Sequence, residues 1–138
     1  MPPRKRRPEE LALVLEPALT PEQFDVWCDA IELFDDGQYW LAHERWEEIW
    51  KVMGDDSADD AEIVLRGFIQ LAAGLHLLGI GRLDGARSNL EKAAQKLGLA
   101  PSVFIGVDVE SVRAMIPLQL GSLAVMKRFR LRRNGADD

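Results

Sequence analysis

Apolar residues recur at spacings of three and four along nearly the whole chain, which is the spacing of one face of an α-helix. One such row lies between Phe24 and Phe34, and another lies between Leu83 and Leu97. Only the connector over 99–107 has β-branched character, and we predict no strand there because nothing else in the chain could pair with it. The sequence therefore predicts an all-α fold, an array of five or six helices.

Capping residues and glycines mark where the predicted helices begin and end. Thr20 can cap a helix that starts at Pro21, with Gln23 completing a capping box. Gly37 ends that helix. Further helices are predicted over 39–53, from 59 or 60 to 78, over 83–97 and from 108 onward, with a loop over 54–57. The third is apolar nearly all round, so we expect it to be the central helix, and Pro117 must kink or split the last one.

The chain contains an internal repeat with an offset of 44 residues. Gly37-Gln38-Tyr39-Trp40-Leu41-Ala42 aligns with Gly81-Arg82-Leu83-Asp84-Gly85-Ala86, and Trp46 then falls on Leu90. Each copy reads as a tight turn followed by a helix whose small residue lets a partner helix approach. The pattern resembles the second half of a tetratricopeptide hairpin, but the offset is longer than that family's period and only two copies exist. We therefore predict two stacked helical hairpins with tetratricopeptide-like halves.

The composition suits a single domain. The chain has 138 residues, of which 47% are apolar, and its one cysteine, Cys28, excludes a disulfide scaffold. We divide it into a basic tail and lead-in over 1–19, a helical domain over 20–126 and a basic tail over 127–138. The longest apolar stretch, Phe68–Leu78, is too short to span a membrane, and the basic N-terminal run lacks the pattern of a signal peptide. We therefore expect a cytoplasmic protein.

Charge is divided unevenly between the ends and the body of the chain. Residues 4–7 and 127–133 hold nine basic residues, whereas residues 8–126 hold eight basic and 21 acidic ones. An acidic body does not bind phosphate backbones over a broad face. We therefore expect the tails to aid solubility or to fold back on the body rather than to contact nucleic acid, and the partner we expect is a protein or peptide.

The densest cluster of chemically active residues lies in the second predicted helix, in the run His43-Glu44-Arg45-Trp46-Glu47-Glu48-Ile49-Trp50. His43, Glu47 and Trp50 share one helical face, and Trp46 borders it. Glu47 could orient His43 through one ring nitrogen and raise its basicity. The two could equally be a buried pair that fixes helix packing, and the sequence leaves both interpretations open.

A metal site is a weaker interpretation of this cluster. His43-Glu44-x-x-Glu47 has the spacing of the zincin motif, with Glu where the second His belongs. Two histidines and one cysteine make a small ligand set. We therefore expect no metal and no cofactor.

Gln70 and His76 interrupt the apolar third helix. Buried amide and imidazole groups need hydrogen-bond partners, and the polar face of the second helix is their natural source. Because the two positions differ by about 120° around a helix, both cannot point at one spot. Gly67 and Gly74 allow another helix to approach closely. The predicted site is one polar and aromatic pocket formed by His43, Glu44, Trp46, Glu47, Trp50, Gln70 and His76.

These residues resemble an uncharacterised family. His43-Glu44-x-x-Glu47-x-x-Trp50, then Gly67-x-x-Gln70-x-x-Ala73-x-x-His76, then Gly81 with Gly85-Ala86 and Asn89-Leu90, are similar to the family catalogued as domain of unknown function 309. Gly106-Val107-Asp108-Val109 resembles that family's Gly-x-Asp stretch, so the resemblance covers residues 27–120. It implies a small all-helical bacterial or archaeal protein, and it implies no reaction, substrate or cofactor. It marks as signature positions His43, Glu44, Glu47, Trp50, Gln70 and His76.

The residues leave two classes of function open. The first is a binding or scaffold module, favoured by the hairpin repeat and by the lack of a complete catalytic set. The second is a small enzyme or small-molecule binder that uses His43 and Glu47 as an acid–base or metal-binding pair, with tryptophans as pocket walls. The exposure of His43 and Glu47 separates them, because a pair sealed from solvent and bonded to Gln70 or His76 is structural.

Overall fold

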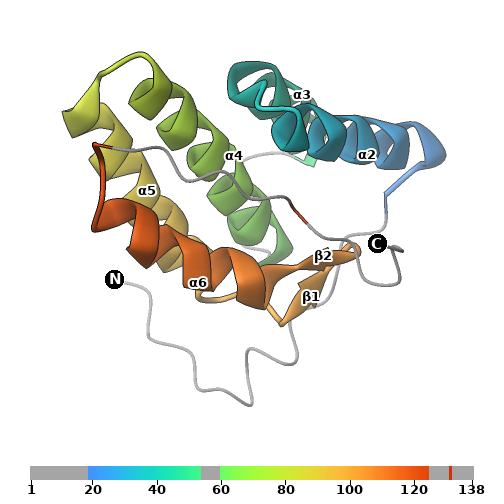
Figure 1. Cartoon of the computed structure of the whole chain (residues 1–138). Coiled ribbons are helices and arrows are strands. Elements are labelled where there is room, and N and C mark those ends of the chain that lie inside the picture. Colours follow the sequence, from blue (N-terminus) through green and yellow to red (C-terminus); the bar gives the residue numbers. More distant parts are fainter. Residues whose placement is uncertain (1–18, 54–59, 125–130, 132–138) are drawn as a thin grey trace.

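The computed structural model describes residues 19–53, 60–124 and 131 (Figure 1). Its elements, in chain order, are α2 (Pro21–Asp35), α3 (Tyr39–Met53), α4 (Asp60–Gly79), α5 (Leu83–Leu97), β1 (Val103–Phe104), β2 (Val107–Asp108) and α6 (Val109–Leu120). The described part is thus five helices and one two-stranded sheet, which confirms the all-α prediction. The predicted loop over 54–57, Asp59 and the predicted tails, apart from Leu19 and Leu131, lie outside the described residues.

The predicted helix ends are confirmed where the sequence carries capping signals. Oγ1 of Thr20 accepts a hydrogen bond from the N–H of Gln23 at 3.1 Å, and Oε1 of Gln23 accepts one from the N–H of Thr20 at 2.9 Å. α3 and α5 have the bounds that the periodicity predicts. Asp108 caps α6, which stays one helix through Pro117. Because Pro117 lies in the last turn, it removes one hydrogen bond there and does not split the helix.

The two turns of the repeat have the same backbone geometry. The N–H groups of residues 36–38 bond to the carbonyls of residues 32–34, and residues 80–82 bond to 76–78 in the same pattern. Gly37 has a φ of 84° and Gly81 has a φ of 82°. Only glycine adopts this left-handed conformation without steric cost, which explains the glycine at the same place in each copy.

The helices form two hairpins, α2–α3 and α4–α5, which stack because α3 packs on α4 (Figure 1). α4 packs most extensively on α5, and its glycines allow this approach. A Cβ atom on Gly67 would lie 3.1 Å from Cγ of Leu97, and one on Gly74 would lie 3.0 Å from Cγ of Leu90. α6 then packs on α5, so α4 is the central helix that the sequence predicts.

α4 is apolar nearly all round because it is the central helix of the array. By length and composition alone, Ala61–Gly79 is the one segment of the described chain that could cross a membrane. However, 67% of that window is buried inside the protein, as in the core helix of a stacked array.

The connector between α5 and α6 contains a β-hairpin, so the prediction of no strand there is wrong. β1 and β2 pair antiparallel, with Phe104 opposite Val107. The connector pairs with itself by reversing over Ile105 and Gly106, whose φ angles are 45° and 82°. Two positive φ angles are what the common two-residue hairpin turn requires. A β-branched residue is rare at positive φ, so this turn carries no ordinary sequence signal.

Trp27 of α2 fixes this hairpin against the helices. Its indole Nε1 donates a hydrogen bond to the carbonyl oxygen of Ile105 at 3.1 Å. The ring is fully buried and its centroid lies 5.9 Å from that of Trp46, 5.5 Å from Phe68 and 5.9 Å from Phe104. These three rings come from α3, α4 and β1, so one side chain joins four elements.

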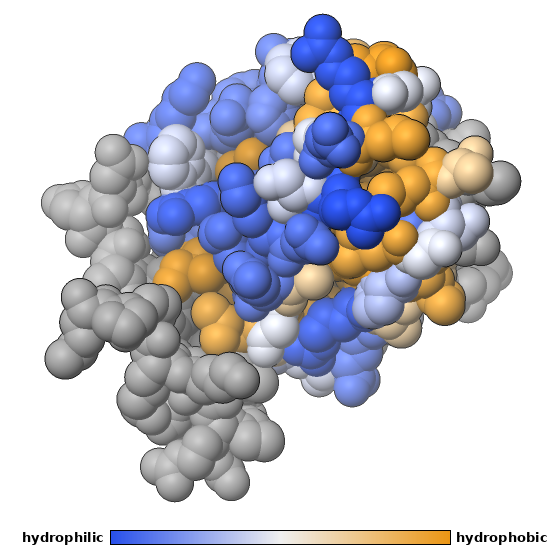
Figure 2. Space-filling model, turned by 90° about the vertical axis from the view of Figure 1, so that its left-hand side faces the viewer, coloured by the Kyte–Doolittle hydropathy of each residue, from blue (hydrophilic) through white to orange (hydrophobic). Residues whose placement is uncertain are grey.

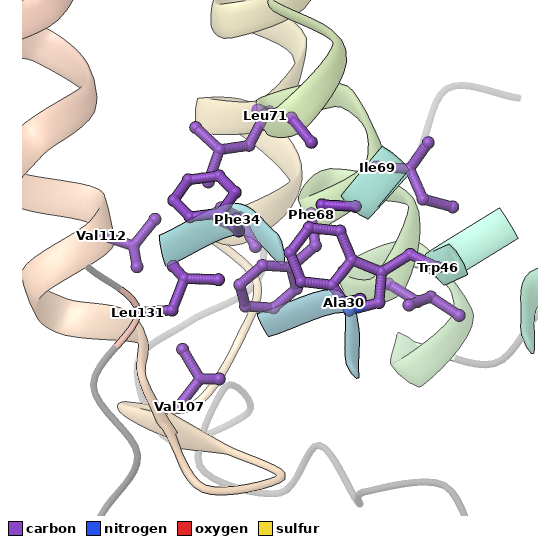
Figure 3. Packing of buried hydrophobic residues seen from close by; sticks show 14 of the residues in the cluster. Ala30, Phe34, Trp46, Phe68, Ile69, Leu71, Val107, Val112 and Leu131 are labelled. Carbon is purple, nitrogen blue, oxygen red and sulfur yellow. The ribbon is translucent and has the colours of Figure 1, made fainter. Parts of the chain in front are cut away.

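Leu131 belongs to the core, although the sequence places it in the basic tail over 127–138. Its side chain is buried and lies near Val107 and Val112, with Phe34 close by (Figure 3). Its backbone N–H donates a hydrogen bond to Oδ1 of Asp35 at 2.7 Å. The core therefore includes a residue beyond the predicted domain boundary at 126.

The contribution of the Trp27 hydrogen bond to stability can be measured with a matched pair of variants. Trp27→Phe and Trp46→Phe each remove an indole from the same aromatic cluster, but Nε1 of Trp46 has no hydrogen-bond partner among the described residues. We expect Trp27→Phe to lower the free energy of unfolding by about 1–2 kcal/mol more than Trp46→Phe, because it removes the hydrogen bond from the buried indole to the Ile105 carbonyl. Urea unfolding measures both, and equal losses would show that the bond to Ile105 contributes nothing.

The repeat glycines give a second test. At Gly81 an added Cβ would meet no atom within 4 Å, so Gly81→Ala adds only backbone strain at φ 82°. We expect it to lower the free energy of unfolding by about 1–2 kcal/mol. The control is Gly121→Ala, where φ is −76° and an added Cβ would meet atoms at ordinary distances of 3.5 and 3.6 Å. A loss as large in the control would mean that φ is not the cause.

Candidate functional site

The candidate site is a surface strip where α3 and α4 lie against each other. The two helices run antiparallel, because residues near the start of α3 contact the end of α4, and residues near the end of α3 contact the start of α4. We call this surface the α3–α4 strip. It consists of Trp40, His43, Glu47 and Trp50 of α3 and of Glu62, Arg66 and His76 of α4.

One end of the strip is a stack of three rings. The centroid of Trp40 lies 4.5 Å from that of His43 and 4.9 Å from that of His76. The ring planes are tilted by 30° and 45°. Trp40 is nevertheless 45% exposed. An indole that is held by two imidazoles from two helices therefore remains open to solvent.

His43 and Glu47 lie next to this stack. Nε2 of His43 is 3.5 Å from Oε2 of Glu47, and the two side chains are 13% and 33% exposed. Nδ1 of His43 is buried and has no hydrogen-bond partner among the described residues. The pair predicted from the i, i+4 spacing is therefore formed, and it is reachable from solvent rather than sealed.

The other end of the strip is built on a buried carboxylate. Glu62 is 1% exposed, and its Oε1 accepts a hydrogen bond from Nε1 of Trp50 at 2.5 Å. Arg66 binds the same oxygen, and its guanidinium carbon lies 5.8 Å from the centroid of the Trp50 ring. The cation and the indole N–H together compensate the charge that Glu62 carries into the protein.

The two ends differ in charge. Near Glu62, burial lowers the pKa of Lys96, and repulsion from Arg66 and Lys92 lowers it further against an opposing attraction to Glu62. Cations thus gather at the Trp50 end. On the far side of α3, hydrogen bonds to Glu48 and Asp29 raise the pKa of Arg45 above its ordinary value.

The structure places the residues predicted for the pocket in different environments. His43, Glu47, Trp50 and His76 belong to the strip, and Glu44 lies exposed on α3. Trp46 lies instead in the core, where its centroid is 5.4 Å from that of Phe68 and its ring stands near Ala30 (Figure 3).

Gln70 lies between the strip and the face of α4 that packs on α5. Around α4 it lies within about 60° of Gly67 and Gly74, which pack on α5, and about 120° from His76, which contacts α3. Its Oε1 is buried without a hydrogen-bond partner among the described residues. The structure brings His76 to Trp40, whose ring also contacts His43, and Gln70 makes no hydrogen bond to a described residue of the strip through Oε1.

Three residues of the strip are missing from the predicted pocket, and each had a sequence signal. Trp40 precedes His43 by three residues, so the row His43, Glu47, Trp50 extends back one turn to it. Glu62 and Arg66 are spaced i, i+4, the spacing of a helical ion pair. In the described part of the chain, no three His, Cys, Asp or Glu residues are grouped so that they could hold a metal ion.

Fold and strip together define a small helical-hairpin protein with an aromatic and ionisable surface between its hairpins. Over residues 27–89 the chain matches the model of the family described as Domain of unknown function (DUF309), which confirms the resemblance seen in the sequence. The match contains the whole strip, whereas Gly106 to Val109 lies beyond it. A search of curated proteins found no match.

The ion pair at the Trp50 end yields a test of its structural role. Arg66→Met leaves the buried carboxylate of Glu62 without its cation, and we expect the free energy of unfolding to fall by about 2–4 kcal/mol. The double variant Glu62→Leu with Arg66→Met removes both charges, and we expect it to be more stable than Arg66→Met alone. Urea unfolding of the three chains decides this, and a double variant that is less stable than Arg66→Met would contradict it.

Proposed function

We propose that this chain is a binding module that receives a protein or peptide partner at the Trp40 end of the α3–α4 strip. The observation that carries the proposal is the exposed indole of Trp40, stacked on His43 and His76. Exposed tryptophans are costly to leave in water and are enriched among the residues that contribute most to protein interfaces. The cytoplasmic location expected from the sequence is part of the same proposal.

The stack also reduces the entropic cost of binding. A side chain that must become ordered in a complex costs about 0.5–1.5 kcal/mol. Trp40 is already held by two rings from two helices. Because the Trp40 side chain is already ordered, it loses little further entropy when a partner binds. Burial of its apolar surface therefore contributes more fully to affinity.

The internal repeat supports a role other than folding. In the second hairpin, the residues at the positions of Trp40, His43 and Trp50 are Asp84, Arg87 and Ala94. Asp84 and Arg87 are exposed, and the side of the molecule that α5 covers carries many hydrophilic side chains with hydrophobic ones between them (Figure 2). The buried positions Ala42 and Ala86 are identical, as stacking requires. The hairpin architecture therefore does not demand the rings of the strip.

A second candidate is an acid–base role for His43. The separation of 3.5 Å between His43 and Glu47, together with their exposure, favours it. A catalytic site also needs a nucleophile or a group that stabilises developing charge near the base. Arg66 and Glu62 bind each other at the other end of the strip, so we rank this role below binding.

Site-specific photo-crosslinking tests the binding role. A benzophenone amino acid replaces Trp40 in one version of the full chain and Phe24 in another. Phe24 is 46% exposed on α2 and is therefore a matched control. We expect crosslinks to a discrete protein partner in the native cells from position 40 and not from position 24. Substitution of His43 by Ala in the position-40 version removes the neighbouring ring of α3 and should reduce their yield.

Two results would contradict the proposal. Equal labelling from both positions would show that an exposed aromatic site alone captures proteins. The absence of any discrete product from position 40 would show that no partner occupies this end of the strip. Thermal unfolding of each version serves as a check that the fold is retained.

A further inference from the structure

Neither lysine nor arginine occurs at residues 36–44 or 72–80, the segments of α3 and α4 next to Trp40, and the imidazoles of His43 and His76 contact its ring. Along α3 and the turn before it, the charged residues among 36–44 are Asp36 and Glu44, and residues 72–80 of α4 contain none. The cations of the strip gather at the opposite end, around Arg66 and Lys96. The exposed indole therefore lies at the end of the strip where the fixed charges are negative.

Two carboxylates continue from Trp40 along α3. Glu44 and Glu47 follow it by four and seven residues, one and two helical turns away on nearly the same face. Glu44 is exposed and makes no ion pair with another described residue, and Glu47 is 33% exposed beside His43. The nearest cation on α3 is Arg45, which is held by Asp29 and Glu48 at 2.7 and 2.9 Å. Neither carboxylate of the Trp40 end is therefore neutralised by it.

An exposed indole near two carboxylates, Glu44 without an ion-pair partner among the described residues and Glu47 beside His43, has a specific chemistry. Tryptophan is the aromatic side chain that attracts a cation most strongly over its face. A guanidinium can stack on such a ring and donate hydrogen bonds to a carboxylate at the same time. We infer that the group that packs on Trp40 is a lysine or arginine side chain, presented by a basic segment of the partner protein. This inference rests on the proposed function, because it names the chemistry of the partner for the same surface.

Other occupants fit less well. An acidic peptide would be repelled by Glu44 and Glu47, and a purely apolar segment would leave both carboxylates to be desolvated without a counter-ion. The basic residues 4–7 and 127–133 of a second copy have the required chemistry too. The crosslinking experiment separates these sources, because self-association yields a product of twice the mass of the chain.

Peptide-binding measurements test directly whether this surface prefers cationic side chains. Five fluorescent peptides of equal length carry a central pair of Arg, Lys, Leu, Gln or Glu residues in a glycine–serine background, and anisotropy gives Kd for the full chain. We expect the Arg and Lys peptides to bind at least about tenfold more tightly than the Gln and Glu peptides at low salt. Raising the salt concentration should weaken their binding, because the carboxylates are exposed.

Variants test whether the peptides bind at the surface around Trp40. Trp40→Leu should weaken Kd for the Arg peptide by about three- to thirtyfold. Glu44→Gln with Glu47→Gln should weaken it and reduce its salt dependence. The matched controls are Phe24→Leu, another exposed aromatic residue, and Glu91→Gln, the repeat counterpart of Glu47 on α5. Both controls should leave Kd within about twofold of the parent.

The outcomes separate this inference from the proposed function. If position 40 crosslinks a partner but basic peptides bind no better than the others, the surface is a binding site and the cationic inference is wrong. If basic peptides bind equally well to Trp40→Leu, the inference is also wrong, since the acidic body alone attracts them. If neither peptides nor crosslinks are found, the inference and the proposed function both fail.

Discussion

The hydrogen bond from the indole of Trp27 to the carbonyl of Ile105 is the contact on which the rest of this fold depends. It joins α2 to a hairpin 78 residues later in the chain, and the same ring packs against residues of α3, α4 and β1. The bond helps to hold Ile105 at a positive φ that is unfavourable for a β-branched residue. The hairpin in turn leads directly into α6, which is also held to α5 where Arg113 donates hydrogen bonds to the carbonyls of Leu97 and Ala100.

The repeat explains why a candidate site exists between the hairpins. Two copies of one turn, 44 residues apart, set α3 against α4 with their ends reversed. This juxtaposition brings Trp40 to His76 and Trp50 to Glu62. Ala42 and Ala86, the small residues at matching positions of the two copies, allow the helices to stack closely. Neighbouring positions that differ between the copies are available for rings and charges. The residues that stack the hairpins and the residues of the proposed binding surface are therefore different residues of the same helices.

The helices could be predicted from sequence because their signals are local. Periodicity and flanking glycines defined α3 and α5, and the i, i+4 spacing correctly paired His43 with Glu47. What failed depends on contacts distant in sequence. The turn at Ile105 is held by Trp27, and Leu131 is a single apolar residue between arginines with no periodic pattern around it. Gln70 is grouped with His43 by its polarity, and its position on α4 lies near Gly67 and Gly74, which pack on α5.

The burial of Leu131 has a consequence for the order in which the chain folds. The two hairpins close over short stretches of sequence, whereas the bond from Leu131 to Asp35 closes a loop of 96 residues. Contacts of such long range are formed late, because the entropy of loop closure must be overcome first. On a ribosome, α2 to α6 emerge before residue 131, so the hairpins can assemble while Val107 and Val112 still lack their last apolar neighbour. Leu131 thus enters the core only after all five described helices have been synthesised.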